Sequence, residues 1–241
     1  MKSKLLAIAV SSIIVALVAN ASYANMNKRP NLDGLVYWHG DQSEPKIALT
    51  FDDGPNEPYT SEILDILKKY NVKATFFVLG KNVESYPSTM KRIVEEGHVI
   101  GNHTYSHPYL LLKSKTQIKY QIKRTEQNIM QITGVKPYLF RSPYGVDNKW
   151  IYLAAKQMGY VTIEWSVTGN NGGKEIQSEK IANDVLKGTE NGSIILLHDG
   201  DRLIRHADRS HIVKALPFII ESLQKKGYEF VTVPKLIGLE D

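Results

Sequence analysis

The sequence predicts an α/β domain with about seven parallel strands. Short apolar runs rich in β-branched and aromatic residues alternate along the chain with segments whose apolar residues recur at helical spacing. Glycines also stand where a helical segment ends and the next apolar run begins, which is typical of helix C-termini. This alternation implies parallel βαβ units, and both a barrel and a doubly wound sheet fit it.

The first expected strand, residues 47–51, is the run Ile-Ala-Leu-Thr-Phe, and two aspartates follow it directly. Six further runs of the same kind are expected as strands, at residues 74–79, 98–102, 138–141, 160–165, 194–198 and 228–233. No Gly-x-Gly-x-x-Gly or Walker pattern follows a strand, so the sequence does not support nucleotide binding.

The expected helices lie between these runs. Residues 63–67 carry one apolar stripe and residues 90–94 another, and the longest amphipathic segment covers residues 115–132. Shorter segments with helical spacing follow at 153–158, 181–186 and 213–223. The glycines expected just after helices are Gly97, Gly134, Gly159, Gly188 and Gly227.

The N-terminus predicts export. Residues 1–24 combine two lysines, an apolar run and a Ser-Tyr-Ala cleavage pattern, so we expect a signal peptide that is removed. An uncleaved membrane anchor is the alternative, but the apolar run is shorter than the roughly 20 residues that a span prefers. Residues 25–45 are expected to form an N-terminal extension, and residues 46–241 one catalytic domain. The mature protein is expected in the periplasm, at the cell wall or outside the cell, with no stable membrane span.

Composition narrows the classes of partner and site. The chain has no cysteine, so only His, Asp and Glu remain as strong metal ligands. The formal net charge is +5, of which Lys2 and Lys4 contribute two. No dense basic stripe with interleaved aromatic residues is present, so no nucleic acid is expected as a partner. We expect a monomer.

Polar and aromatic residues gather at the C-terminal ends of the expected strands. In an α/β barrel those ends meet on one face, where active sites lie. Burying a carboxylate costs free energy unless a metal ion, a cation or a hydrogen bond compensates it. In an adjacent pair, one carboxylate can bind a metal ion while the other transfers a proton. Asp53-Gly54-Pro55 is also a common turn sequence, so the pair alone does not decide the matter. The residues at strand ends are Asp52, Asp53, His103, Arg141, Glu164, Trp165, His198 and Asp199.

His103 and His107 are four residues apart. On one helical turn these positions share a face, so both imidazoles would reach one metal ion. Alone, such a pair is often incidental. With an aspartate from another strand end it becomes a set of two nitrogens and one oxygen, which leaves positions open for water and substrate as in hydrolytic zinc sites.

Four segments together resemble, in order, motifs one, two, three and five of the polysaccharide deacetylase family, also called the NodB-homology domain or carbohydrate esterase family 4. They are Thr-Phe-Asp-Asp-Gly-Pro at 50–55, His-Thr-Tyr-Ser-His at 103–107, Arg-Ser-Pro-Tyr-Gly at 141–145 and Leu-Leu-His-Asp at 196–199. The similarity covers residues 45 to 235. It implies a distorted (β/α) barrel of the NodB-homology type.

The resemblance also implies a divalent metal ion, usually Zn²⁺, with Co²⁺, Ni²⁺ or Mn²⁺ as alternatives. Asp53, His103 and His107 would be its ligands. Asp52 would be the general base that takes a proton from the attacking water, and His198 the general acid that protonates the leaving amine.

Five further residues receive supporting roles from the resemblance. Arg141 would orient or tune Asp52, although a plain ion pair in a loop would also explain it. The backbone N–H of Tyr144, which follows Pro143, would help to hold the oxyanion. Trp165 and Leu196 would form the pocket for the acetyl methyl group, although both residue types are also common in cores.

The chain departs from the family at motif four, where an Asp-Trp pair is usual and its aspartate tunes the catalytic histidine. Here Asn171 and Gly172 stand at that spacing. A neutral asparagine cannot stabilise a protonated His198 as a carboxylate does. We therefore hypothesise a lowered pKa for His198, unless another carboxylate such as Glu164 takes over the role.

The function predicted from these residues is an exported, metal-dependent deacetylase of glycans that contain N-acetylglucosamine, in peptidoglycan or chitin-type oligomers. One alternative is an O-acetyl esterase acting on xylan-type glycans, since the same groups cleave esters. A second is a glycan-binding domain with a weakened site. A glycosidase would place paired carboxylates around the scissile bond and would need no metal-binding histidine pair.

Overall fold

The computed structural model describes residues 34–169 and 177–239. Within these residues the chain forms one nine-stranded sheet in which every strand pair is parallel. The sheet order is β1-β6-β5-β4-β3-β2-β8-β7, and β9 pairs with β2 outside this path. The strands are β1 Val36–Tyr37, β2 Lys46–Asp52, β3 Thr75–Val78, β4 Val99–Asn102, β5 Leu139–Phe140, β6 Val161–Ile163, β7 Val167–Thr168, β8 Ile194–His198 and β9 Glu229–Phe230.

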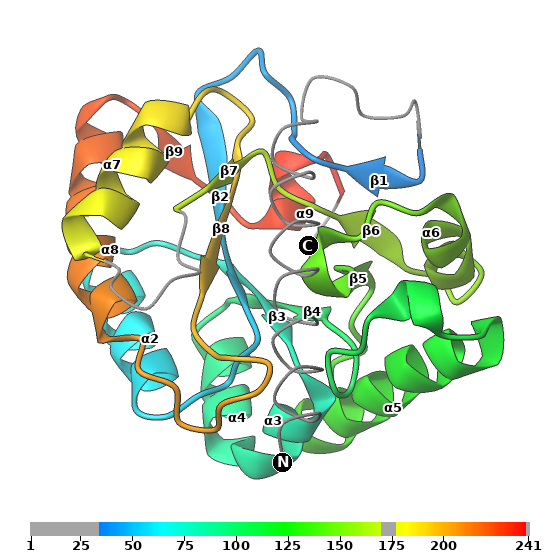
Figure 1. The fold of residues 1–241 in the computed structure, drawn as a ribbon. Helices are drawn as coiled ribbons and strands as arrows, with labels where there is room; N and C mark the ends of the chain where they lie inside the picture. The colour runs from blue at the N-terminus through cyan, green and yellow to red at the C-terminus, as the bar shows by residue number, and fades with distance from the viewer. Residues whose placement is uncertain (1–33, 170–176, 240–241) are drawn as a thin grey trace, which may run out of the picture. The chain divides into compact units, whose positions relative to one another are not determined.

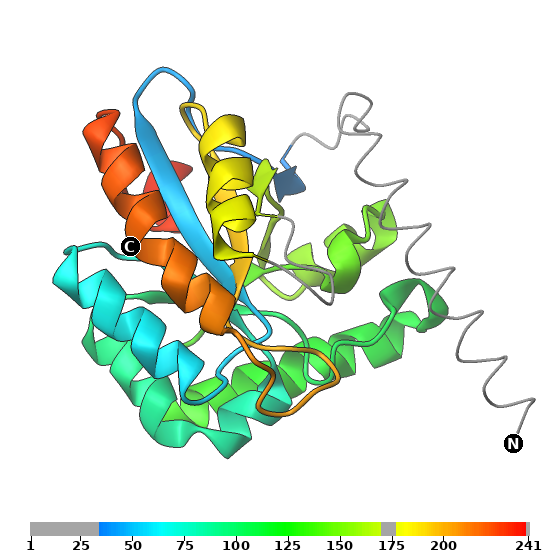
Figure 2. The same cartoon turned by 60° about the vertical axis from the view of Figure 1, so that its left-hand side comes forward.

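Helices cover the outer face of this sheet, which curls into a half-barrel with β1 and β7 at its two edges (Figures 1 and 2). They pack side by side in the order α7, α8, α2, α4, α5, α6. The helices are α2 Tyr59–Lys69, α3 Gly80–Ser85, α4 Pro87–Glu95, α5 Lys115–Thr133, α6 Lys149–Lys156, α7 Ser178–Gly188, α8 Ser210–Lys225 and α9 Val233–Leu236, with 3-10 turns η2 Leu110–Leu112 and η3 Pro143–Gly145.

The longest helix, α5, has clear sequence signals at both ends. The Ser114 side chain accepts a hydrogen bond from the Gln117 amide, and the Gln117 side chain accepts one from the Ser114 amide, which completes a capping box. At the other end Gly134 has φ 73°, a left-handed conformation that costs glycine little. The boundaries expected from the sequence are therefore confirmed to within a residue.

The sheet separates two apolar clusters because side chains alternate along each strand. On β2, Ile47, Leu49 and Phe51 enter the larger cluster under α2, α4, α7 and α8, whereas Ala48 enters the smaller one beside α9. The side chains of Thr50 and Asp52 point to the same side of β2 as Ala48, and both are buried. The pleat of β2 therefore directs Asp52 to the inner face of the half-barrel.

The expected fold class is confirmed, and the seven expected runs are the positions of β2, β3, β4, β5, β6, β8 and β9. The two additional strands, β1 and β7, have two residues each, too few to give a periodic pattern. Gly188 differs from its expected role: it is the last residue of α7, and Thr189 caps that helix in an extended conformation. Among the described residues, no helix has both the length and the apolar character that a membrane span requires.

Candidate metal centre and active site

The turn after β2 brings two neighbouring carboxylates to one site. Asp52 ends the strand, and Asp53 has φ 73°, which reverses the direction of its side chain relative to an extended residue. The Asn82 side-chain amide donates to the Asp53 carbonyl oxygen at 2.7 Å, which fixes the turn. Gly54 is required here because a Cβ on it would lie 2.0 Å from the Asp199 carboxylate. The expected turn therefore forms.

The two histidines meet without a helix, so the expected helical turn is wrong. Residues 103–109 have no helical structure, and Thr104 and His107 have φ 71° and 56°. Side chains hold this irregular path: the Thr104 amide donates to Asn102 Oδ1 at 2.9 Å, and the His107 amide donates to Thr104 Oγ1 at 3.1 Å. The imidazole ring centres are nonetheless 4.9 Å apart.

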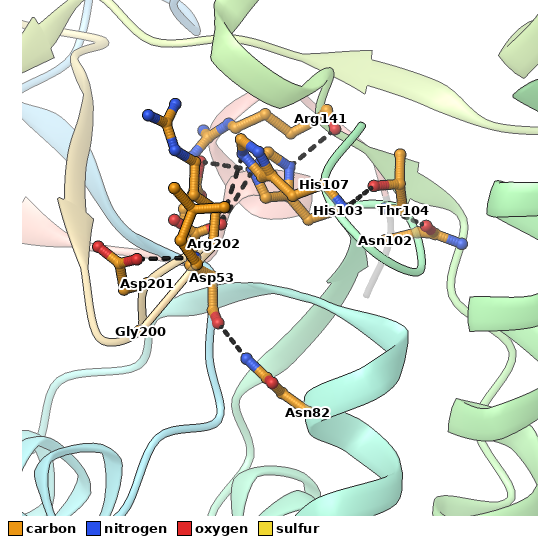
Figure 3. Close-up of polar contacts among 12 residues, drawn as sticks. Asp53, Asn82, Asn102, His103, Thr104, His107, Arg141, Gly200, Asp201 and Arg202 are labelled. Carbon is orange, nitrogen blue, oxygen red and sulfur yellow. Dashed lines mark hydrogen bonds and ion pairs between the residues drawn. The ribbon is translucent and has the colours of Figure 1, made fainter. Parts of the chain in front are cut away.

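Asp53, His103 and His107 offer one oxygen and two nitrogens that all lie within 4.8 Å of one another (Figure 3). Asp53 Oδ1 is 3.5 Å from His107 Nε2 and 3.7 Å from His103 Nε2. His103 Nδ1 contacts the Arg141 carbonyl oxygen at 2.9 Å, an outer contact that directs Nε2 towards the cluster. Asp53 Oδ1 is buried and has no hydrogen-bond partner among the described residues. This donor set fits a divalent metal ion such as Zn²⁺.

Burial sets the protonation preferences of the three residues in this cluster. Burial, and then the neighbouring Asp52 charge, raise the pKa of Asp53 well above its usual range. Burial also lowers the pKa of both His103 and His107. Neutral imidazoles with free lone pairs are the form that binds a metal ion, and a bound cation would stabilise the Asp53 carboxylate.

Arg141 is fully buried and reaches across the inside of the half-barrel to Asp52. Its Nη1 donates to Asp52 Oδ1 at 2.7 Å and to Thr50 Oγ1 at 2.8 Å, while Nε and Nη2 donate to the carbonyl oxygens of Ile163 and Glu164 at 3.1 and 3.0 Å. The guanidinium carbon also lies 4.0 Å from the ring centre of Phe77. Arg141 is thus anchored on three strand segments and is not a loop ion pair.

His198 and Leu196 both face the inner side of β8. Asp52 and His198 are register partners across β2 and β8, which places the expected base and acid side by side. Leu196 is buried, whereas His198 keeps partial contact with solvent. Burial lowers the pKa of His198 to about 4, and nearby Arg209 acts in the same direction although Asp52 opposes it. Asn171 and Gly172, at the motif-four position, lie outside the described residues.

The segment after Arg141 lines the same site. Tyr144 has a left-handed backbone (φ 64°), and its ring centre is 4.5 Å from that of His107. Pro143 before it is buried. A Cβ on Gly145 would lie 2.4 Å from the Trp165 ring, so this glycine admits the indole. Nine of the ten residues given roles from the sequence lie at the C-terminal ends of β2, β4, β5, β6 and β8 or in the segments that follow them, and Leu196 lies in the middle of β8.

Asp199 and Arg202 have no role assigned from the sequence, and Glu164 has one only as a substitute for the motif-four acid. Asp199 is buried behind the turn, where Thr60 Oγ1 donates to its Oδ2 at 2.7 Å and its own amide donates to the Asp52 carbonyl oxygen at 3.2 Å. Burial raises the pKa of Asp199 to about 7 and that of Glu164 to about 8. Arg202 lies against Tyr144. Of these residues, Asp199 could have been linked to the site from the sequence by its neighbour, because it directly follows His198.

Comparison with known proteins identifies the family. The polysaccharide deacetylase family model matches residues 39–163. A peptidoglycan-N-acetylglucosamine deacetylase of Bacillus cereus is 42% identical over 203 residues, covering 82% of this chain and 70% of the relative. The chain belongs to the polysaccharide deacetylase family.

Other polysaccharide deacetylases extend this relationship. The peptidoglycan-N-acetylmuramic acid deacetylase PdaA of Bacillus subtilis is 36% identical over 209 residues, covering 84% of this chain and 75% of the relative. The crystal structure of a peptidoglycan N-acetylglucosamine deacetylase superposes with a TM-score of 0.79 at 40% identity, covering 86% of this chain and 94% of the other. The resemblance expected from the four motifs is confirmed, and the described fold is the one that this family shares.

Proposed function

We propose that this polysaccharide deacetylase is an exported, metal-dependent hydrolase that removes N-acetyl groups from glycans containing N-acetylglucosamine. The observation that carries the proposal is the buried Asp53, His103 and His107 cluster beside the Asp52–Arg141 pair and His198. Relatives that act on peptidoglycan support a cell-wall glycan as substrate, and chitin-type oligomers share the same N-acetylated sugar.

Asp53, His103 and His107 would hold the metal ion. When bound there, a divalent ion would polarise the acetyl carbonyl and make the attacking water more acidic. Zn²⁺ suits the two nitrogens and one oxygen, with Co²⁺, Ni²⁺ or Mn²⁺ as alternatives.

Asp52 accepts the proton of the attacking water in this proposal. Its Oδ1 is occupied by the Arg141 guanidinium at 2.7 Å, which leaves Oδ2 as the basic atom that faces the site. Oδ2 also lies 3.6 Å from His103 Nε2, so the base sits beside the proposed metal ligands. Arg141 acts as a positioning residue, since its other donors hold the guanidinium in one orientation.

His198 delivers a proton to the leaving amine. Because its pKa is about 4, His198 is neutral in the resting site at neutral pH. The proton that it delivers must therefore come from solvent, with which His198 keeps partial contact, as negative charge develops on the acetyl oxygen. The backbone N–H of Tyr144, held by the turn that Pro143 begins, is proposed to donate to that oxygen. Trp165 and Leu196 are proposed to enclose the acetyl methyl group.

The decisive experiment measures acetate released from N-acetylglucosamine oligomers, peptidoglycan and acetylated xylan, with and without chelator. Acetate release from the first two that is lost on chelation and in Asp52→Asn supports the proposal. Release from xylan alone would indicate the O-acetyl esterase. Chelator-resistant release of sugar would indicate a glycosidase, and binding without any acetate release would indicate a non-catalytic domain.

Matched variants separate the metal site from general damage to the fold. His107→Gln should lose both bound metal, measured by atomic emission, and acetate release. His39→Gln changes an exposed histidine far from the cluster in sequence and should retain both. Retention of stoichiometric metal by His107→Gln would overturn the ligand assignment.

Export and domain organisation form part of the proposal. Residues 1–24 would be removed, residues 25–45 would remain as an extension, and residues 46–241 would form the catalytic domain. Val36–Tyr37, within that extension, pair with β6, which supports retention of this part in the mature protein. Mass spectrometry of protein recovered from the periplasm or the medium tests this, since an intact Met1 would contradict cleavage after Ala24.

A further inference from the structure

The loop between β8 and α8 places a cationic side chain at the candidate active site. The Arg202 guanidinium carbon lies 4.7 Å from the ring centre of Tyr144, and this ring centre lies 4.5 Å from that of His107. Figure 3 shows Arg202 beside the two histidines, on the same loop as Gly200 and Asp201. Arg202 is partly exposed, so it faces both the site and solvent.

The backbone of this loop is fixed at several points around Arg202. Asp201 Oδ1 accepts from the Leu203 and Ile204 amides at 2.8 and 2.9 Å, and Asp201 Oδ2 accepts from Arg209 Nη2 at 3.1 Å. Lys81 Nζ, on α3, donates to the Arg202 carbonyl oxygen at 2.7 Å. The position of Arg202 is therefore set by both neighbouring residues and an adjacent helix.

The charge of Arg202 has no acceptor within the part of the chain that the structure describes: its guanidinium makes no hydrogen bond or ion pair with residues 34–169 or 177–239. The other two arginines at the site differ in this respect. Arg141 pairs with Asp52 at 2.7 Å, and Arg209 pairs with Asp201 at 3.1 Å. A guanidinium offers five donors in a planar fork that matches a carboxylate, so an unpaired one at a substrate site is suited to an anionic group.

We propose that Arg202 binds a carboxylate carried by the substrate glycan and so selects acid-bearing glycans over neutral ones. The inference rests on the proposed deacetylase function and names the substrate class of that same site. The ring of Tyr144 supports the guanidinium through a cation–π contact, which holds the fork in one plane.

The geometry suits a carboxylate close to the acetamido group. Because the Tyr144 ring contacts both His107 and Arg202, the cation and the proposed metal ligand are separated by little more than one aromatic ring. A sugar that carries an acetamido group on one carbon and a lactyl ether on the next could bridge that span. N-Acetylmuramic acid in peptidoglycan has this chemistry, whereas chitin-type oligomers have no carboxylate.

A different role for Arg202 would be to offset the negative charge of Asp53 and Asp201, independently of the substrate. The two roles predict different kinetics. Charge balance within the protein would affect every substrate alike, whereas carboxylate recognition changes the ratio between a charged substrate and its neutral counterpart.

The experiment compares acetate release from two forms of one peptidoglycan tetrasaccharide, one with free lactyl carboxylates and one with these converted to methylamides. Wild type should show a kcat/KM for the carboxylate form higher by at least about tenfold, the lower end of the range for a hydrogen bond to a charged group. Arg202→Gln should abolish this preference, and Arg202→Lys should keep only part of it. About 0.5 M salt should weaken the preference in wild type, because the contact is partly exposed.

Arg205→Gln is the matched control, since Arg205 is an exposed arginine on the same loop without a contact to Tyr144. It should keep the wild-type ratio. Binding of the carboxylate form to Asp52→Asn, followed by calorimetry, should weaken about tenfold when Arg202→Gln is added. This provides a readout that does not depend on turnover.

Each outcome has a distinct meaning. Equal kcat/KM for the two forms in wild type, an equal loss on both forms in Arg202→Gln, or the same loss of preference in Arg205→Gln would each overturn the carboxylate site while leaving the deacetylase function standing. No acetate from either form would overturn the proposed function instead.

Discussion

Replacing Arg141 with methionine removes the buried guanidinium that links β2 to the end of β6 inside the half-barrel. The change deprives the Asp52 carboxylate, Thr50 Oγ1 and two strand carbonyls of their donor, and all of these contacts are buried. Removing one partner of a buried ion pair costs about 3–5 kcal/mol, because the remaining charge has lost both water and partner. For a chain of this size that corresponds to a fall in melting temperature of roughly 6–20 °C.

Urea unfolding of metal-free protein, monitored by circular dichroism, measures this cost. Arg92→Met is the control, since Arg92 pairs with Asp65 at the surface and its loss should cost less than about 1 kcal/mol. Asp52→Asn should recover at least about 1 kcal/mol when added to Arg141→Met, because it removes the orphaned charge. The reasoning would be refuted if Arg141→Met were as stable as Arg92→Met. It would also be refuted if Asp52→Asn changed the free energy of unfolding equally in wild type and in Arg141→Met.

Three further predictions concern pH and backbone geometry. Burial lowers the pKa of His98 to about 4 from 6.5, so the unfolded chain binds a proton there before the folded one. As pH drops from about 6.5 to 4, His98 should lower the free energy of unfolding by up to about 3 kcal/mol. His98→Asn should reduce the pH slope by this amount in urea titrations at each pH, and the other histidines whose pKa burial lowers, such as His198, should account for the slope that remains. Asn171→Asp should stabilise protonated His198 and move the alkaline limb of kcat to higher pH, and an unchanged limb would exclude Asn171 as the tuning residue. Gly145→Ala should lower the free energy of unfolding by about 2–4 kcal/mol and reduce acetate release, because the added Cβ would overlap the Trp165 ring. The control is Gly134→Ala, which has a similar φ but open space around the added Cβ, and it should lower the free energy of unfolding by only about 1 kcal/mol.

The strand positions and the active face were predictable because both depend on local pattern. Apolar runs marked β2, β3, β4 and β8, and parallel βαβ units bring the C-terminal ends of such strands together. That placed Asp52, His103, Arg141 and His198 in one site before their contacts were known. The pleat of β2 could also have shown that Asp52 shares the inner face with Thr50.

The irregular parts of the site were not predictable from pattern. His103 and His107 have helical spacing, but left-handed residues held by Asn102 and Thr104 bring their rings together. Such paths depend on single side-chain hydrogen bonds, which leave no periodic signal. The charge pattern of residues 199–211 indicates a loop that could affect specificity, but it does not single out Arg202. The position of Arg202 depends on contacts made by Lys81, on α3, and by Arg209, at the start of α8.

The place of β2 in the sheet has a consequence for how the protein loses activity. β2 pairs with β3 on one side and with β8 on the other, and its first two residues, Lys46 and Ile47, pair with β9. The amides around Asp52 should therefore exchange with solvent deuterium only through cooperative opening of the whole domain. Heat inactivation should therefore coincide with global melting, whereas substitutions in the exposed part of the loop after β8 should leave the pairing of β2 intact.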